Sequence, residues 1–212
     1  MIINWYGEGC FKIQTGGLTL LTDPLESSTG LTPARGKNDL VLKTLTAWPF
    51  EVESGKSKVE SEEGQLIRGA GEYEIQGVSV LGFSLLKESS EKFLKSVYKV
   101  SVEDLSLGFL GHLSGELTPE ANQALKDADV LFIPAGGKPF INQESAAKLI
   151  KQLSPKFVVA SFFKVPGLKR GGSDWNDLAD EMGQKPEVSE KLTIRKKDAA
   201  EQKGTKLVVL KI

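Results

Sequence analysis

Few side chains in this sequence could bind a metal or act on a reacting bond. The 212 residues include one histidine, His112, and one cysteine, Cys10. A single cysteine excludes an internal disulfide and any cysteine-rich metal site. Cys10 precedes Phe11, and no nearby group would lower its pKa. We therefore predict that Cys10 is a small buried hydrophobe.

The carboxylates and hydroxyls give only weak signals. Asp23 follows an apolar run, where it is better explained as a strand-end residue that bonds local backbone amides than as a catalytic acid. Glu72 and Glu74 alternate with apolar residues, so we expect both on the solvent-facing side of one strand. Ser84 and Ser161 have no base that the sequence can place beside them.

His112 follows Leu110-Gly111 in a turn. It could be a residual base or a lone metal ligand. The interpretation we favour is a loop histidine that is hydrogen-bonded to backbone.

Length and composition favour one soluble domain over residues 1–212. Forty per cent of the residues are hydrophobic and 26% are charged, which suits one buried core. The net charge of −1 gives no overall field that would attract nucleic acid or an anionic membrane. No apolar run is long enough to span a membrane, and residues 1–6 lack the pattern of a signal peptide. We expect a cytoplasmic protein.

The first half of the chain predicts β-structure. Apolar runs separated by glycine-bearing turns predict strands, and they cover residues 2–6, 10–14, 18–22, 39–44, 64–75, 78–83, 97–102 and 105–110. The stretch 51–63 is highly charged and predicts a solvated connection.

The second half adds helices between strands. Thr118 and Asn142 are expected N-caps of the first two helices, and Ser173 of a third over 174–182. Apolar strands are expected at 130–134 and 157–162, and two more at 192–195 and 207–210. Hairpins followed by alternating helices and strands predict two packed sheets flanked by helices, an αββα sandwich of the α/β (α+β) class.

An ordered set of short motifs then resembles the metallo-β-lactamase superfamily. The motifs are Asn4–Phe11, Leu20–Pro24, Asp39–Leu42, Gly71–Ile75, Leu107–His112 and Asp127–Gly137. Within the superfamily the chain is similar to the compact branch of ascorbate-6-phosphate lactonases and related zinc-dependent hydrolases. The resemblance implies a four-layer fold and a pair of zinc ions that activate water for hydrolysis.

The positions at which the family carries its metal ligands hold other residues here. They are Leu45, Ala47, Pro49 and Phe50 in place of His-x-His-x-Asp-His, with Lys87, Phe109 and Phe162 at three further ligand positions and Glu8 at a histidine near the first turn. One imidazole cannot supply a dizinc site of this kind. We therefore predict no metal and no cofactor. We also predict that Leu45, Ala47, Phe50, Phe109 and Phe162 converge on a sealed former active site.

The resulting prediction is a degenerate member of the superfamily that acts as a non-catalytic structural or interaction protein, a pseudoenzyme. Its expected partner is a protein, either a second copy or an active paralogue in a homo- or hetero-oligomer. The first alternative is a hydrolase of a lactone or phosphodiester that acts by a route without zinc, through His112 or the Glu72 and Glu74 carboxylates.

The second alternative is a nucleic-acid-binding module. It would depend on a basic face made of Lys164, Lys169, Arg170, Arg195, Lys196 and Lys197. Acidic residues interleave with these positions and no aromatic platform accompanies them, so a solvated face is the favoured interpretation.

Overall fold

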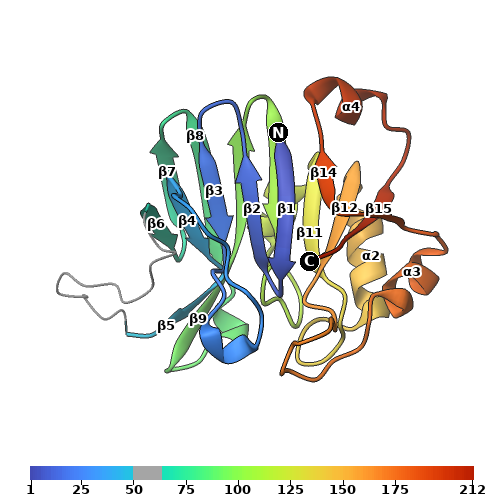
Figure 1. The fold of residues 1–212 in the computed structure, drawn as a ribbon, viewed down its shortest axis with the longest axis horizontal. Coiled ribbons are helices and arrows are strands. Elements are labelled where there is room, and N and C mark those ends of the chain that lie inside the picture. Colours follow the sequence, from blue (N-terminus) through green and yellow to red (C-terminus); the bar gives the residue numbers. More distant parts are fainter. Residues whose placement is uncertain (50–63) are drawn as a thin grey trace.

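Two β-sheets pack face to face in the computed structural model, which describes residues 1–49 and 64–212 (Figure 1). This arrangement confirms the predicted sandwich. The predicted connection 51–63 lies outside the described residues.

The first sheet consists, in the described chain, of six strands in the order β14-β1-β2-β3-β4-β6. Their bounds are β1 Ile2–Gly7, β2 Cys10–Gln14, β3 Thr19–Thr22, β4 Leu40–Lys43, β6 Gln65–Arg68 and β14 Lys191–Thr193. Strands β1, β2 and β3 pair antiparallel, whereas β3, β4 and β6 are parallel. The strands predicted in this part of the sequence are confirmed.

The second sheet runs in the order β13-β15-β12-β11-β10-β9-β8-β7. Its strands are β7 Gly71–Ile75, β8 Val78–Ser84, β9 Phe93–Val102, β10 Leu105–Phe109, β11 Val130–Pro134, β12 Phe157–Ser161, β13 Glu187–Ser189 and β15 Lys206–Leu210. The hairpin strands β7 to β10 are antiparallel, and β10, β11, β12 and β15 are parallel because helical connections separate them. A short strand β5, Leu45–Ala47, pairs with β9.

The helices are α1 Pro119–Leu125, α2 Gln143–Leu153, α3 Asn176–Met182 and α4 Lys196–Glu201, with 3-10 turns η1 Ser27–Thr29 and η2 Leu86–Glu88. Thr118 and Asn142 cap α1 and α2 through their side chains, as predicted. The predicted cap at Ser173 is wrong, since α3 begins at Asn176 without a side-chain cap. Backbone bonds from Ser173 to Gly136 and Lys164 hold it in the preceding loop.

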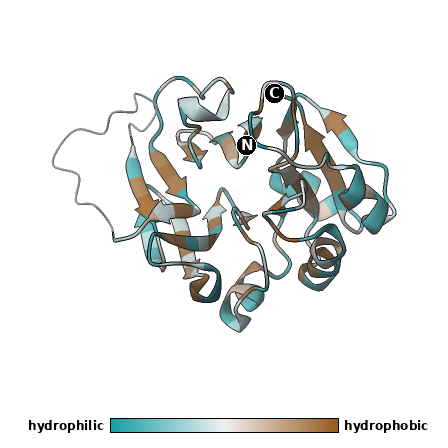
Figure 2. Cartoon of the chain, turned by 90° about the horizontal axis from the view of Figure 1, so that it is seen from below, coloured by the Kyte–Doolittle hydropathy of each residue, from teal (hydrophilic) through white to brown (hydrophobic). Residues whose placement is uncertain are grey.

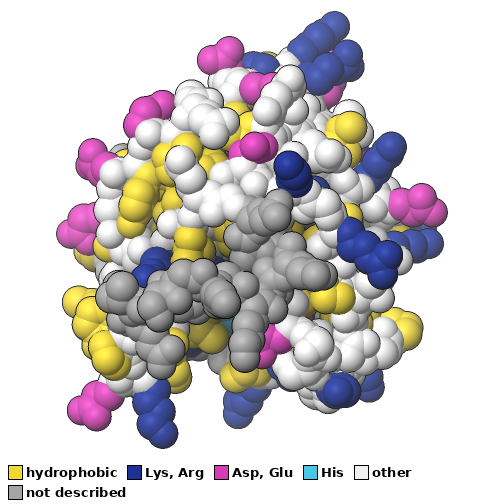
Figure 3. Space-filling model, turned by 60° about the vertical axis from the view of Figure 1, so that its left-hand side comes forward, with side chains coloured by type: hydrophobic (Ala, Val, Ile, Leu, Met, Phe, Trp, Pro, Cys, Tyr) yellow, Lys and Arg dark blue, Asp and Glu magenta, His cyan; other side chains and the backbone are white. Residues whose placement is uncertain are grey.

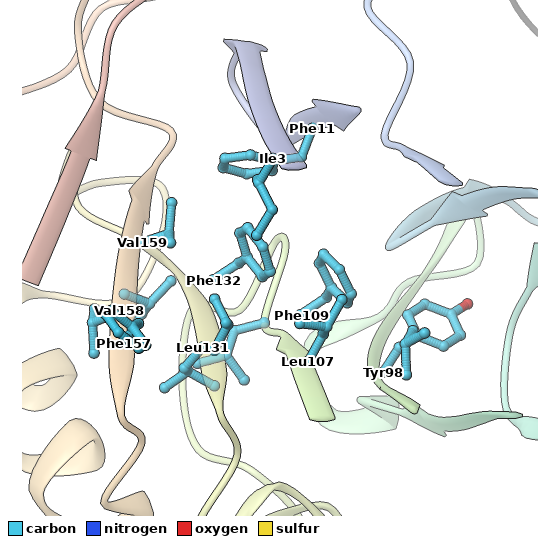
Figure 4. Packing of buried hydrophobic residues seen from close by; sticks show 14 of the residues in the cluster. Ile3, Phe11, Tyr98, Leu107, Phe109, Leu131, Phe132, Phe157, Val158 and Val159 are labelled. Carbon is cyan, nitrogen blue, oxygen red and sulfur yellow. The ribbon is translucent and has the colours of Figure 1, made fainter. Parts of the chain in front are cut away.

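Aromatic side chains from both sheets form the centre of the core. Phe11 of β2 lies 4.6 Å from Phe132 of β11, and Phe132 stacks on Phe109 of β10 at 4.5 Å between ring centroids (Figure 4). Helix α2 buries its predicted apolar face, and Figure 2 shows hydrophobic residues concentrated on the strands. The core thus extends to the strand ends at β10.

A smaller apolar cluster lies on the other face of the first sheet. Cys10 and Leu21 point there, because side chains alternate along a strand. Leu25 and Ala34, from the segment that contains η1, cover them. Burial raises the pKa of the Cys10 thiol to about 12, which fits the predicted buried hydrophobe.

Candidate functional site

Three strand ends meet at one edge of the sandwich and bring Asp23, Thr44 and His112 together. Asp23 follows β3, Thr44 follows β4 and His112 lies just beyond β10. The Thr44 backbone N–H donates to Asp23 Oδ1 at 2.7 Å, and the Thr44 hydroxyl donates to Asp23 Oδ2 at 2.6 Å. The same hydroxyl oxygen lies 2.8 Å from His112 Nδ1. We call these residues the Asp-Thr-His chain.

Both predicted local interpretations need correction. Asp23 is a strand-end residue that accepts a backbone N–H, as predicted, but the N–H belongs to Thr44, 21 positions away. The two residues meet because the parallel strands β3 and β4 end side by side. His112 bonds a side chain rather than backbone.

The hydrogen bonds of Thr44 determine which nitrogen of the neutral imidazole carries the proton. When Asp23 is ionised, the Thr44 hydroxyl gives its one proton to Asp23, and His112 Nδ1 is then the donor to the Thr44 oxygen. The neutral ring then carries its lone pair on Nε2, which has no hydrogen-bond partner among the described residues.

Burial favours the uncharged forms of both titratable groups. It raises the pKa of the Asp23 carboxyl, while His112 and the Thr44 bonds lower it in part. Burial lowers the pKa of His112, and the Asp23 charge opposes that shift. The 4.0 Å approach of His112 Nδ1 to Asp23 Oδ2 is therefore a link through Thr44 rather than an ion pair.

This environment gives a testable titration. The folded pKa of His112 lies below the ordinary 6.5, so the unfolded chain binds the proton first as the pH falls. The contribution of neutral His112 to stability is complete above 6.5 and is lost as the pH falls through the folded pKa. Because the chain has one histidine, NMR titration of its ring protons reports on this residue alone. A midpoint at or above 6.5 would contradict the burial argument.

Aromatic rings close the site on its inner and outer sides. Phe162 contacts His112 edge to face at 4.7 Å, and Phe140 lies 4.5 Å from Phe162. Deeper in, Phe109 and Phe162 border a cavity of only about 10 Å³ beside Asp23 and Thr44. A space of this size is at the lower limit for one water molecule.

An ion pair joins the first turn to a loop near the C-terminal helices. Arg170 donates to both carboxylate oxygens of Glu8, at 2.9 and 3.0 Å, and to the Phe162 carbonyl at 2.7 Å. Its guanidinium also lies 5.0 Å from the centre of the Phe140 ring. Arg170 thus fastens the aromatic cover of the Asp-Thr-His chain.

A second polar group lies beside the turn that carries His112. Glu88 accepts bonds from the Ser114 and Gly115 backbone and from the Ser114 hydroxyl, each at 2.7 Å. Lys95 donates to Ser114 Oγ at 2.7 Å. Glu88 therefore anchors this turn to η2 and β9.

Only part of the predicted convergence is correct. Phe109 and Phe162 meet at the cavity, but Leu45 and Ala47 do not join them. In β5 these two side chains share the exposed face, whereas Thr46 between them is buried, since side chains alternate in a strand. Pro49 is exposed, Lys87 is exposed on η2, and Phe50 lies outside the described residues.

The remaining predicted candidates lie elsewhere. Glu72 and Glu74 are exposed on β7, as expected. Four of the six basic residues pair with carboxylates, which is the case for Arg170 with Glu8, Arg195 with Asp198, Lys196 with Asp129 and Lys197 with Glu201. These pairs weaken the case for a basic nucleic-acid surface.

Sequence reasoning missed Thr44, Arg170 and Phe140 as site residues. The adjacent ends of two parallel strands could have indicated the contact between Asp23 and Thr44. No local signal indicates the Glu8 and Arg170 pair, because 162 positions separate the two residues.

The donor groups at this edge do not match a two-zinc site. Among the described residues, no group of three or more His, Cys, Asp or Glu side chains is placed to hold a metal. Of the nearby donors, Asp23 has both oxygens bonded to Thr44, and His112 is the one imidazole of the chain. Two zinc ions need several imidazoles and a bridging anion.

Two mixed sheets with a site at the converging strand ends define the metallo-β-lactamase fold class. The chain belongs to the beta-lactamase superfamily domain family, whose sequence model matches residues 2–161.

The chain is similar to other proteins over most of its length. A UPF0173 protein of Pyrococcus abyssi is 26% identical over 196 residues, which cover 82% of this chain and 87% of that protein. A Thermotoga maritima structure, inferred to be a zinc-dependent hydrolase of the metallo-β-lactamase superfamily, matches with a TM-score of 0.78 and 23% identity over all of both chains. An inferred metal-dependent hydrolase of Parabacteroides distasonis matches with a TM-score of 0.61 and 15% identity, over 99% of this chain and 93% of that one. These two structural matches show the fold alone.

Proposed function

We propose that this protein is a metal-free member of its superfamily that acts as a non-catalytic structural or interaction protein. The observation that carries the proposal is how the strand-end edge is filled. Phe109 and Phe162 occupy it, the cavity that the described residues leave beside them measures about 10 Å³, and the nearby Asp23 carboxylate is already bonded to Thr44. A hydrolytic centre would need open space for a water molecule and a substrate there.

The apolar ligand positions support the same proposal. Leu45, Ala47 and Pro49 offer no atom that binds zinc, and Leu45 and Ala47 face away from the cavity. The hydrogen bonds among Asp23, Thr44 and His112 hold the strand ends together at the edge where the resemblance implies metal ions.

The proposed partner is another protein, either a second copy or an active relative, in the cytoplasm. The support is a set of exposed apolar side chains near β5 and η2. Trp48 is 47% exposed and Leu86 is 74% exposed, and both border a depression with Phe93 and Leu94. Figure 3 views the side of the molecule that carries β5 and shows several exposed hydrophobic groups there. The described part of the chain has no helix long and apolar enough to cross a membrane.

Thermal unfolding with zinc and with a chelator tests the metal-free proposal. A ligand that binds the native state raises the unfolding temperature by mass action. We expect equal unfolding temperatures in excess zinc and in EDTA. A midpoint several degrees higher in zinc, reversed by EDTA, would contradict the proposal.

A hydrolase that works without zinc is the second candidate. The observation that favours it is the Asp-Thr-His chain, which leaves His112 Nε2 without a partner among the described residues and thus able to accept a proton. The test is turnover of generic lactone and phosphodiester substrates by the wild type and by His112→Asn. Turnover that persists in EDTA and is lost in the variant would favour this candidate over the first.

A further inference from the structure

The loop between β12 and α3 reaches the aromatic cover of the Asp-Thr-His chain through Arg170, and polar contacts hold the middle of this loop. We call residues 163–175 the strap; they follow Phe162, the first residue after β12, and lead to Asn176, the start of α3 (Figure 1).

The two ends of the strap are packed on the core, through buried Phe163 and partly buried Val165 and Trp175. Most residues between these ends are exposed, and Arg170 is partly buried. Segments with few buried apolar contacts open at lower free energy than the core does.

Backbone bonds attach the strap at two further places, on either side of Arg170. Ser173 N–H donates to Gly136 O at 3.0 Å, and Lys169 N–H donates to Thr29 O at 3.0 Å. These attachments hold the two sides of the strap, but neither reaches His112.

Arg170 supplies the contact that reaches the site. Its guanidinium donates two hydrogen bonds to the Glu8 carboxylate and one to the Phe162 carbonyl oxygen. It also lies over Phe140, which packs on Phe162, and Phe162 packs on His112. An unbroken series of contacts therefore runs from the strap to the imidazole, through Arg170, Phe140, Phe162 and His112.

The ion pair has the geometry of a strong but separable contact. The Arg170 side chain is 25% exposed and that of Glu8 is 13% exposed, so solvent screens the pair only in part. Two parallel N–H to oxygen bonds make it directional. The pair joins segments 162 residues apart, and breaking it removes no strand pairing. The Phe162 N–H still donates to the Glu8 carbonyl at 3.1 Å, so the strap opens beyond Phe162.

We propose that the Glu8 and Arg170 pair is a latch that holds the strap closed over His112, and that opening the latch exposes the imidazole while both sheets stay folded. The closed state leaves 21% of the His112 side chain exposed. The open state removes the support of Phe140 and Phe162 and admits a small reagent to the ring.

The single histidine makes this proposal directly measurable. Diethyl pyrocarbonate modifies imidazole, and the rate of modification reports on access to His112 alone. We expect Glu8→Gln to raise this rate about tenfold, because a neutral amide cannot replace a charge-assisted two-bond contact. Arg170→Lys, which keeps the charge but loses the fork, should give a smaller increase.

The matched control is Glu144→Gln. It removes an exposed ion pair with Lys148 on α2, outside the strap. Its modification rate should equal that of the wild type, since exposed pairs of this kind contribute little.

Hydrogen exchange followed by mass spectrometry separates the latch from a general loss of stability. In Glu8→Gln, the amides of residues 163–175 should exchange faster, while those of β2 and β11 stay as in the wild type. Wild-type modification and exchange rates in both latch variants would overturn the proposal. Faster exchange throughout the sheets would also overturn it, because the pair would then support the whole fold.

Discussion

Replacing Gly111 with alanine should lower the free energy of unfolding by about 3 to 5 kcal/mol, at the upper end for single substitutions. A Cβ on Gly111 would lie 2.1 Å from Thr44 Oγ1 and 2.2 Å from Thr44 Cβ. Thr44 cannot move aside without breaking its bonds to Asp23 and His112. Gly111 also has φ +46°, which strains any residue with a side chain.

Gly77→Ala separates the two causes. Gly77 has φ +79°, but no atom lies within 4 Å of an added Cβ. Its substitution should cost only the backbone strain, about 1 to 2 kcal/mol. Urea unfolding of both variants is the measurement. Equal losses would show that the Thr44 contact does not restrict Gly111.

Asp23→Ala should destabilise the protein by about 2 to 4 kcal/mol, because the Thr44 backbone N–H and hydroxyl lose their buried acceptor. Asp23 also has φ +35°, which alanine tolerates poorly. Removing a carboxylate that burial disfavours offsets part of this cost. Denaturant unfolding at pH 7 measures the sum.

Asp23→Asn is the control for charge. Asparagine adopts left-handed backbone readily and keeps an oxygen that can accept the Thr44 N–H. We expect it to lose about 1 kcal/mol, the usual size of one hydrogen bond. A loss as large as that of the alanine variant would mean that the charge, rather than the bonding pattern, holds the strand ends.

Asp23 also makes the free energy of unfolding depend on pH. Its folded pKa is raised, so its favourable contribution is present below the unfolded value and is lost as the pH rises through the folded pKa. This trend runs opposite to that of His112. The Asp23→Asn variant should therefore keep the histidine-linked loss of stability on acidification and lose the carboxylate-linked gain.

The regular elements were predictable where side-chain alternation and capping agree. Strands β1 to β4 and helices α1 and α2 follow from apolar runs, glycine turns and the caps Thr118 and Asn142. β5 was missed because three residues give no period, and its pairing with β9 is a tertiary contact. Helix α4 was missed because its six residues, Lys196–Glu201, are mostly charged and show no apolar period. Its start is marked by Asp198, which accepts the Arg195 backbone N–H.

The site was predictable only in part. Phe109 and Phe162 come together because the carboxyl ends of β10 and β12 meet at one edge of the sandwich. Leu45 and Ala47 face outward because β5 pairs with β9, and the contact of Arg170 with Glu8 is made by a long loop between β12 and α3. Contacts between segments that are distant in sequence determine the orientation of the β5 side chains and the position of Arg170. The local residue pattern does not indicate these contacts.

The proposed function depends most on the claim that this chain does not hold a metal pair. The most direct test is elemental analysis by inductively coupled plasma mass spectrometry, after the protein is incubated with excess zinc and then desalted. The donor set predicts far less than one zinc per chain, and the same result for His112→Asn. One or two zinc ions retained per chain would contradict the account.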